Sequence, residues 1–292
     1  MNTHSINSVS SPPLGNQEEL MSERVTIDIV DGVADVRLNR PNKRNALDLA
    51  MFGGLVRAGD DLKRQRGLRA VVLSGEGQDF CAGLDFRVFE SMRDDEGWAG
   101  AIELPPGSGP AKAAGQRAAH IWTELPVPVI AAISGHALGG GLQIALGADI
   151  RMVAPDAKLS VMEIKWGLVP DMTGTQLLPE LVGRDVAKEL TFSGRILSGT
   201  EAFELGLATR VCADPRGSAL ELAHSIADRN PEAITAAKRL LDLAGRVDLE
   251  TGFAAEQAEI GALVGSANQV EAVNAEFEAR RPRFADRTEH TG

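Results

Sequence analysis

The chain has 292 residues, of which 43% are hydrophobic and 24% charged, and its formal net charge is −11. This composition is typical of a globular protein that is long enough to bury a large core. The negative charge argues against nucleic acid as the natural partner, because phosphate binding favours a basic surface. No apolar run approaches the roughly eighteen residues that cross a bilayer, so no membrane span is expected.

The N-terminal segment and the two cysteines bear on the cellular compartment of the protein. Residues 1–20 are polar and rich in Ser, Asn and Pro, without the apolar stretch of a secretory signal, so they are predicted to form a disordered tail. Cys81 and Cys212 are isolated in sequence, which supports neither a disulfide framework nor a zinc site. The sequence therefore predicts a cytoplasmic protein in which residues 21–292 form a single domain.

The first predicted elements are a β-hairpin, a helix and a strand. Two alternating stretches, Val25–Val30 and Val33–Leu38, flank Asp31-Gly32, a dipeptide that favours a tight hairpin turn. Asp48 is expected to cap a helix that runs to about Arg66. A buried strand is predicted to follow, over Leu68–Ser74.

Residues 87–118 have the least regular pattern in the chain. An acidic run and the breaker-rich segment 104–110 lie within them, and the latter predicts a mobile loop. A helix over Ala111–Leu125 is expected next.

Two glycine turns follow predicted strands. The strand Val129–Ile133 leads through a turn at 134–136 to Gly139, Gly140 and Gly141, which open a helix. The start of a helix carries unpaired N–H groups, and glycine lets a ligand approach them closely. The second turn, 79–86, follows the strand Ala70–Leu73. If they are more than ordinary tight turns, the pair can aim two N–H groups at one oxygen.

The remaining elements are predominantly helical. Strands are predicted over 149–153 and Lys158–Val161, and a helix over Thr173–Leu181. Almost everything after Gln176 is expected to be helical, with Leu205–Val211 as the one strand-like exception. The four last predicted helices are Gly217–Arg229, Pro231–Ala244, Leu249–Val264 and Asn268–Arg280.

Five segments in order resemble the crotonase, or enoyl-CoA hydratase/isomerase, superfamily. They are LNRPNKRNAL (38–47), FCAGLDF (80–86), AAISGHALGGG (131–141), MEIKWGLVPDMTGTQLLPELVG (162–183) and FEARRPRF (277–284). The resemblance implies an α/β fold, a right-handed spiral of ββα units over about 24–212 with a helical C-terminal section over about 213–285. It also implies a homotrimer or a hexamer built from two trimers.

The resemblance also implies the substrate and its contacts. The substrate is an acyl-CoA thioester, with coenzyme A as part of the substrate and no metal or redox cofactor. The backbone N–H groups of Leu84 and Gly140 are expected to hold the thioester oxygen as an oxyanion hole. The residues expected to contact the substrate or its coenzyme A are Lys43, Arg44, Ala46, Ala82, Asp85, Gly139 and Gln143, with further cations at Arg280, Arg281 and Arg283.

Two acids are the candidate catalytic groups. From the residues alone, Glu163 is also compatible with a solvated surface acid and Asp171 with a helix N-cap. The resemblance implies that Glu163 is a catalytic glutamate. Gln143 occupies the place of the second hydratase glutamate, and an amide cannot act as a base. An aspartate eight residues after the glutamate, as at Asp171, resembles the Δ3,5,Δ2,4-dienoyl-CoA isomerases, although those also carry an acid at the Gln143 position.

The sequence therefore favours double-bond isomerisation of an enoyl- or dienoyl-CoA by Glu163 and Asp171. The alternatives are an enoyl-CoA hydratase, a crotonase-type hydrolase or C–C lyase, and a non-catalytic acyl-CoA binding module. A Glu163 that faces a pocket favours an enzyme over the binding module. His136 is expected to be a structural histidine and Cys81 a small packed side chain rather than a nucleophile.

Overall fold

The computed structural model describes residues 23–93 and 109–287. The predicted tail over residues 1–20 lies outside the described residues, as does most of the predicted loop 104–110. No helix in the described part of the chain is long and apolar enough to cross a membrane.

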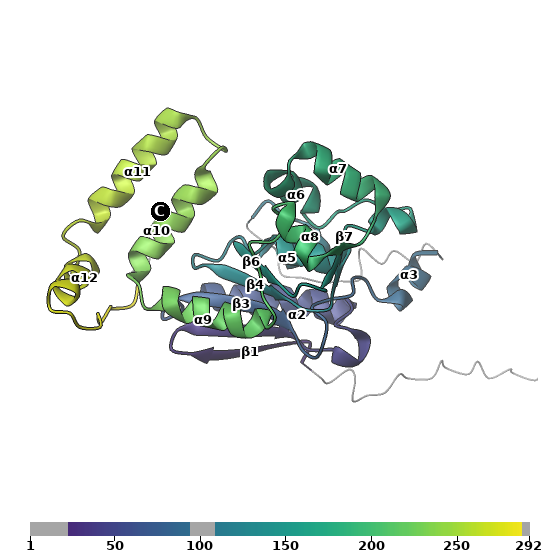
Figure 1. The fold of residues 1–292 in the computed structure, drawn as a ribbon, viewed down its shortest axis with the longest axis horizontal. Helices are drawn as coiled ribbons and strands as arrows, with labels where there is room; N and C mark the ends of the chain where they lie inside the picture. The colour runs from purple at the N-terminus through teal and green to yellow at the C-terminus, as the bar shows by residue number, and fades with distance from the viewer. Residues whose placement is uncertain (1–22, 94–108, 288–292) are drawn as a thin grey trace, which may run out of the picture.

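A sheet of six strands forms the centre of the fold (Figure 1). Its order is β1-β2-β3-β4-β6-β9, with β1 antiparallel to β2 and the other neighbours parallel. The hairpin prediction is confirmed, and both residues of its turn, Asp31 and Gly32, have positive φ. The strands are β1 (Val25–Val30), β2 (Val33–Leu38), β3 (Ala70–Gly75), β4 (Val129–Ile133), β6 (Ile150–Val153) and β9 (Arg210–Val211).

A second sheet of three short strands lies beside it, in the order β5-β7-β8. These strands are β5 (His136–Leu138), β7 (Lys158–Ser160) and β8 (Leu197–Ser198). The chain passes from β4 to β5, through α5 (Gly140–Leu146), and on to β6 and β7. Each advance thus adds one strand to each sheet, which confirms the predicted spiral of ββα units.

The helices of the core are mostly where the sequence predicts them, and Asp48 caps α2 by accepting a hydrogen bond from the Met51 N–H at 2.8 Å. The predicted helix over 111–125 is wrong in length, because α4 ends at His120. There the Thr123 hydroxyl donates to the His120 carbonyl, which a longer helix would use itself. The elements are η1 (Pro41–Lys43), α2 (Leu49–Lys63), α3 (Phe86–Arg93), α4 (Ala114–His120), η3 (Glu163–Trp166), α6 (Gly174–Val182), α7 (Arg184–Ser193) and α8 (Gly199–Glu204).

Two predictions about backbone conformation are corrected. His136 begins β5 instead of closing a turn, because β5 pairs with β7 from that residue onward. The strand-like segment Leu205–Val211 contributes only Arg210–Val211, since the backbone before it closes the end of α8. The short strand β8 was not predicted, and two residues are too few for a periodic pattern.

The central strands of the large sheet are buried on both faces. On one face, α9 (Pro215–Ala227) packs Ala219 and Ala223 against Val72 and Ile130. Most of the core lies on the other face, where α2, α4 and α5 contribute to one apolar cluster. Parallel strands covered on both sides explain the continuous apolar runs in the sequence.

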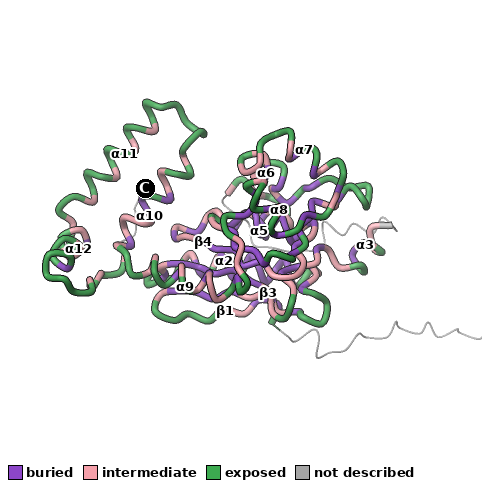
Figure 2. Tube along the Cα trace, viewed as in Figure 1, coloured by how far each residue is buried: buried purple, intermediate pink, exposed green. Residues whose placement is uncertain are grey.

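The last three helices form an arm that stands to one side of the core (Figure 1). They are α10 (Pro231–Leu243), α11 (Leu249–Leu263) and α12 (Ala267–Phe277). An ion pair of 2.7 Å between Lys238 and Asp149 attaches α10 to the core. No residue of α11 is buried, and Figure 2 shows α11 and α12 as mostly exposed.

Candidate active site

The two glycine turns lie against each other. The Cys81 N–H donates to the His136 carbonyl at 2.8 Å, and the Leu138 N–H donates to the Cys81 carbonyl at 3.0 Å. A Cβ on Gly141 would lie 2.4 Å from the Cys81 oxygen, and one on Gly83 would lie 2.6 Å from the Leu138 oxygen. Both positions therefore need glycine, because a side chain would push the two turns apart.

The two predicted oxyanion donors are available at this junction. Leu47 donates to the Gly83 carbonyl at 2.8 Å and accepts from the Asp85 N–H at 3.0 Å. In this parallel-bridge pattern the intervening residue, Leu84, directs its own N–H to the opposite side. Gly140 is the first residue of α5, so its N–H has no acceptor within the helix.

Both donors line one cavity of about 1060 Å³. With the exception of the three arginines that follow α12, every residue that the sequence predicts for catalysis, for the oxyanion hole or for substrate contact borders it. These are Lys43, Arg44, Ala46, Ala82, Leu84, Asp85, Gly139, Gly140, Gln143, Glu163 and Asp171.

Glu163 is held inside this cavity by Gln143. It begins η3 directly after the small sheet, and only 9% of its surface is exposed. The Gln143 Nε2 donates to the Glu163 Oε1 at 2.6 Å. Two backbone N–H groups, of Met172 at 2.9 Å and of Gly174 at 3.0 Å, donate to the Gln143 Oε1 and so fix which way the amide faces. The other Glu163 oxygen, Oε2, has no hydrogen-bond partner among the described residues.

Burial raises the pKa of Glu163 above its ordinary value. Hydrogen bonds from its own backbone and from Gln143 oppose this shift, and the negative charge of Asp171 adds to it. The pKa of Asp171 is also raised by partial loss of solvent, although its side chain is exposed at the cavity wall. The site thus contains two carboxyl groups, both of which hold a proton more readily than in water.

The non-catalytic interpretations of the two acids, a solvated surface acid for Glu163 and a helix N-cap for Asp171, are wrong. Glu163 is a buried residue of the cavity wall and not a solvated surface acid. Thr173, not Asp171, is the N-cap residue of α6. Asp171 therefore has no capping role in the fold.

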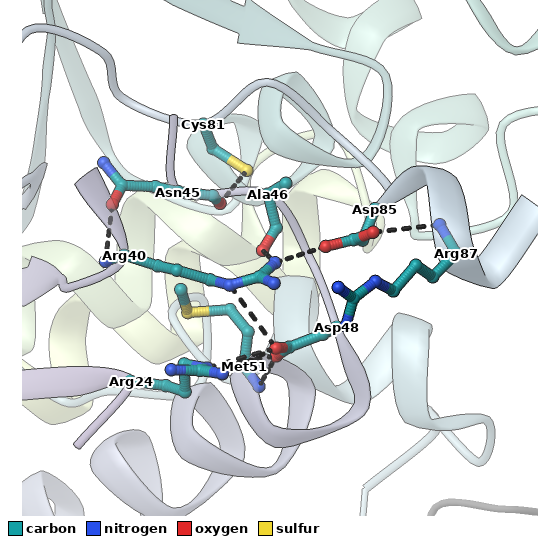
Figure 3. Close-up of polar contacts among 9 residues, drawn as sticks. All are labelled: Arg24, Arg40, Asn45, Ala46, Asp48, Met51, Cys81, Asp85 and Arg87. Carbon is teal, nitrogen blue, oxygen red and sulfur yellow. Dashed lines mark hydrogen bonds and ion pairs between the residues drawn. The ribbon is translucent and has the colours of Figure 1, made fainter. Parts of the chain in front are cut away.

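A buried ionic cluster supports the Leu84 turn (Figure 3). The Arg40 Nη1 donates to the Asp85 Oδ2 at 2.5 Å and to the Ala46 carbonyl at 3.3 Å. Asp85 also accepts from the Arg87 N–H at 2.9 Å. Burial alone would raise the pKa of Asp85, but these donors lower it below its ordinary value. The carboxylate of Asp85 is therefore engaged by the protein itself, although Asp85 borders the cavity.

Arg40 is the residue of this cluster that the sequence did not single out. Its side chain is buried, and it also approaches Asp48 at 3.6 Å, joining the start of α2 to the turn (Figure 3). The one feature of the sequence that could have indicated its role is its position in the run 38–47, between a strand and a capped helix.

His136 and Cys81 have structural roles, as predicted. The His136 Nδ1 lies 2.5 Å from the Asp79 Oδ1, so the ring is paired beneath the glycine turn. Cys81 is fully buried, its Sγ donates to the Asn45 carbonyl, and burial raises its pKa to about 12. A thiol with that pKa is not a nucleophile near neutral pH.

The predicted cations separate into two groups. Lys43 and Arg44 border the cavity, whereas Arg280, Arg281 and Arg283 lie after α12 and do not border it within their own chain. Arg280 pairs with Glu271 at 2.6 Å, and Arg281 pairs with Asp228. Within the described ranges, no three His, Cys, Asp or Glu side chains gather as a metal site would require.

A spiral of ββα units with two joined glycine turns and a carboxylate at one cavity defines a crotonase-type protein. The chain belongs to the enoyl-CoA hydratase/isomerase family, whose family model matches residues 28–287. Members of this family act on acyl-CoA thioesters, so the chain is an acyl-CoA enzyme.

Curated relatives and solved structures agree with this assignment. The chain is 35% identical over 260 residues to the mitochondrial methylglutaconyl-CoA hydratase of Mus musculus, covering 87% of this chain and 79% of the relative. It is also 35% identical over 252 residues to a putative enoyl-CoA hydratase/isomerase of Bacillus subtilis, covering 85% and 93%. The crystal structure of an enoyl-CoA hydratase from Bacillus anthracis is similar with a TM-score of 0.78 and 31% identity, covering 89% and 98%.

Proposed function

We propose that the chain isomerises a carbon–carbon double bond in an enoyl- or dienoyl-CoA, with Glu163 and Asp171 moving the proton. The observation that carries this proposal is the orientation of Gln143. Its Oε1 is fixed by two backbone N–H groups, so only its N–H group faces Glu163. This position therefore cannot supply the second base that would activate a water molecule.

In the proposed reaction, the thioester oxygen accepts hydrogen bonds from the N–H groups of Leu84 and Gly140. The Glu163 carboxylate then removes a proton from the carbon next to the thioester through its unpartnered Oε2. The C–H bond breaks, its electrons move into the thioester carbonyl, and the resulting dienolate is stabilised by the two N–H groups. Loss of one such donor typically costs about 2.7–4 kcal/mol of transition-state stabilisation.

The second half of the reaction returns a proton to the far end of the conjugated system. Asp171 stands at the cavity wall and is electrostatically coupled to Glu163. Partial burial raises the pKa of Asp171, which favours its protonated form and hence its role as the proton donor in this step. A new C–H bond forms there, the enolate collapses to the thioester, and the double bond has moved without loss of any atom. Exchange of a proton with solvent at each acid then returns Glu163 to the carboxylate and Asp171 to the acid.

Hydration is the second candidate, and the names of the relatives favour it. The Mus musculus relative is named a methylglutaconyl-CoA hydratase, and the Bacillus anthracis structure is that of an enoyl-CoA hydratase. In this case Glu163 alone would deliver and remove the protons of water. A hydrolase and a C–C lyase are further alternatives. The non-catalytic binding module is disfavoured, because the chain belongs to a family of acyl-CoA enzymes and its Glu163 is buried at the cavity.

The test is to incubate the protein with 2-enoyl-, 3-enoyl- and 3,5-dienoyl-CoA in deuterated water and to analyse the products by mass spectrometry. Isomerisation with deuterium incorporation, lost in both Glu163→Gln and Asp171→Asn, supports the proposal. Hydration that survives in Asp171→Asn contradicts it and supports a hydratase. Release of free CoA indicates a hydrolase, and tight binding without turnover indicates a binding module.

We also propose that the arm formed by α10–α12 contacts other copies of the chain in a trimer or hexamer. Large apolar side chains on and between these helices are exposed, including Leu241, Leu249, Phe253, Ile260 and Phe277. Burying such a surface is favourable by about 25 cal/mol per Å² of apolar area. Light scattering coupled to size exclusion gives the mass, and a monomer would contradict the proposal. The cytoplasmic location stays a prediction from the sequence.

A further inference from the structure

Three aromatic rings from two elements form one side of the cavity. Phe86 and Phe89 come from α3, and Trp166 ends η3. The rings of Phe89 and Trp166 are stacked with centroids 4.4 Å apart and an angle of 24° between their planes. Phe86 meets Trp166 edge-on, with centroids 5.9 Å apart. We call these three residues the aromatic wall.

Two of the three residues of the aromatic wall are exposed, and Phe89 is half-buried. Phe86 is 70% and Trp166 is 48% exposed. The chain is poor in aromatic residues, with nine Phe, three Trp and no Tyr, yet Phe52 and the three wall residues all border this cavity. An exposed apolar surface of this kind marks a place where a ligand binds.

Among the described residues that border the cavity, no cation lies where it could pair with a charged acyl group at the aromatic wall. The cationic residues that border the cavity are Lys43, Arg44 and Arg87. Lys43 ends η1 and Arg44 follows it, and the Arg87 side chain extends toward Asp48 (Figure 3). A carboxylate on the far end of an acyl group would therefore lose its water without gaining a partner.

The other side chains of the cavity favour an aromatic ring over a plain aliphatic chain. Met92, Met162 and Met172 border the same cavity, and thioethers make favourable contacts with the edges of aromatic rings. A pair of aromatic rings contributes more binding free energy than the burial of its apolar area alone provides. An aliphatic group gains only the free energy of burying its apolar area. The stack of Phe89 on Trp166 also holds the indole plane in place before a ligand arrives.

We propose that the acyl group of the substrate is uncharged and ends in an aromatic ring, which packs on Phe86 and Trp166. This inference rests on the proposed function only in that the cavity binds an acyl-CoA thioester. It names the group that distinguishes the substrate of this chain, and it assigns Trp166 and Phe86 as residues that determine specificity.

The test compares the affinity of saturated thioesters, so that no turnover is needed. Isothermal titration is done with phenylhexanoyl-CoA and cyclohexylhexanoyl-CoA, each with its ring on the terminal carbon, and with the mono-CoA thioester of octanedioic acid. The phenyl compound is expected to bind about 2- to 13-fold tighter than the cyclohexyl compound. The dicarboxylic compound is expected to bind more weakly than both. Equal or reversed affinities for the two ring compounds overturn the proposal.

Variants assign the preference to the aromatic wall. Trp166→Leu and, separately, Phe86→Leu are expected to bring the ratio of the phenyl and cyclohexyl affinities toward one. Val169→Ala removes an exposed apolar side chain of the same cavity without touching a ring, and the ratio is expected to stay as in the parent chain. A ratio that is unchanged in both leucine variants contradicts the assignment. A preference in binding without isomerase turnover contradicts the proposed reaction but not this inference.

Discussion

The carbonyl of Cys81 lies so close to Gly141 that a Cβ on the glycine would be 2.4 Å from the oxygen. Gly141→Ala must therefore separate the two glycine turns, each of which carries one proposed oxyanion donor. We expect unfolding to become easier by about 1–3 kcal/mol, as for other overpacked sites. We expect kcat/KM to fall about 100-fold, because a shift of one donor misaligns the thioester oxygen.

The matched control for this substitution is Gly261→Ala in α11, where an added Cβ meets nothing within 4 Å. Replacing a glycine inside a helix stabilises it by about 0.5–1 kcal/mol. The control should therefore retain full activity and unfold at the same or a higher urea concentration. If the two alanine variants behave alike in urea unfolding and in activity, the close approach of the turns contributes neither to stability nor to activity.

Glu163→Gln is expected to lose activity and gain stability at neutral pH. The loss in kcat should be about 10²- to 10⁴-fold, the usual contribution of a proton-transfer group. The folded chain raises the pKa of Glu163, so the stability it contributes is fully present below the ordinary value of 4.5 and is lost as the pH rises through the folded pKa. The melting temperature of the variant should exceed that of the parent chain at pH 8, and the gap should close as the pH falls to 4.5. A gap that widens toward acidic pH would show that Glu163 is stabilised as a carboxylate.

Gln143→Glu is expected to create a site that adds water to 2-enoyl-CoA. A glutamate at this position keeps the Met172 and Gly174 N–H groups bonded and sets its second oxygen beside Glu163, where Gln143 now donates at 2.6 Å. Two such carboxyl groups share a proton at neutral pH, as paired acids in a closed site do. The measurement is the ratio of hydrated to isomerised product.

Gln143→Met serves as the comparison for that substitution, because it removes the amide without adding a carboxylate. It should lower isomerisation, since Glu163 loses its orienting donor, and it should not add hydration. A parent chain that already hydrates 2-enoyl-CoA as fast as Gln143→Glu would contradict the role assigned to Gln143.

Asp85→Asn is expected to destabilise the fold near neutral pH by about 3 kcal/mol, because it leaves the buried Arg40 with a neutral partner. Arg40 also lies 3.6 Å from Asp48, so the expected loss of stability is at the low end of the range for a broken buried ion pair. The pKa of Asp85 is lowered in the fold, so its stabilisation is present above the ordinary value of 3.8 and is lost as the pH falls through the folded pKa. Urea unfolding of the two chains should therefore converge in acid. A constant difference across pH would mean that the carboxylate charge is not what stabilises the turn.

The sequence predicts the glycine turns and their strands well, because a tight turn with close backbone approach has few solutions and glycine marks them. The resemblance to the family also assigns Glu163 and Asp171 to one site, and both border the cavity. The partners of Gln143 could not be predicted, because they are backbone groups from a segment that is distant in sequence. The role of Arg40 could not be predicted for the same reason, because it depends on contacts between loops. The separation of α10–α12 from the core could not be predicted either, because the sequence does not show which surface covers their apolar faces.

Glu163 and Trp166 occupy the same short turn, η3, which begins with the acid and ends with the indole. Any change that rotates this turn to admit a different acyl group also rotates the proton-transferring carboxylate. Substitutions at Trp166 are therefore expected to trade selectivity against turnover, whereas Phe86, on a separate helix, can be changed independently. For directed evolution of substrate range, a library at α3 should yield active variants more often than one at η3.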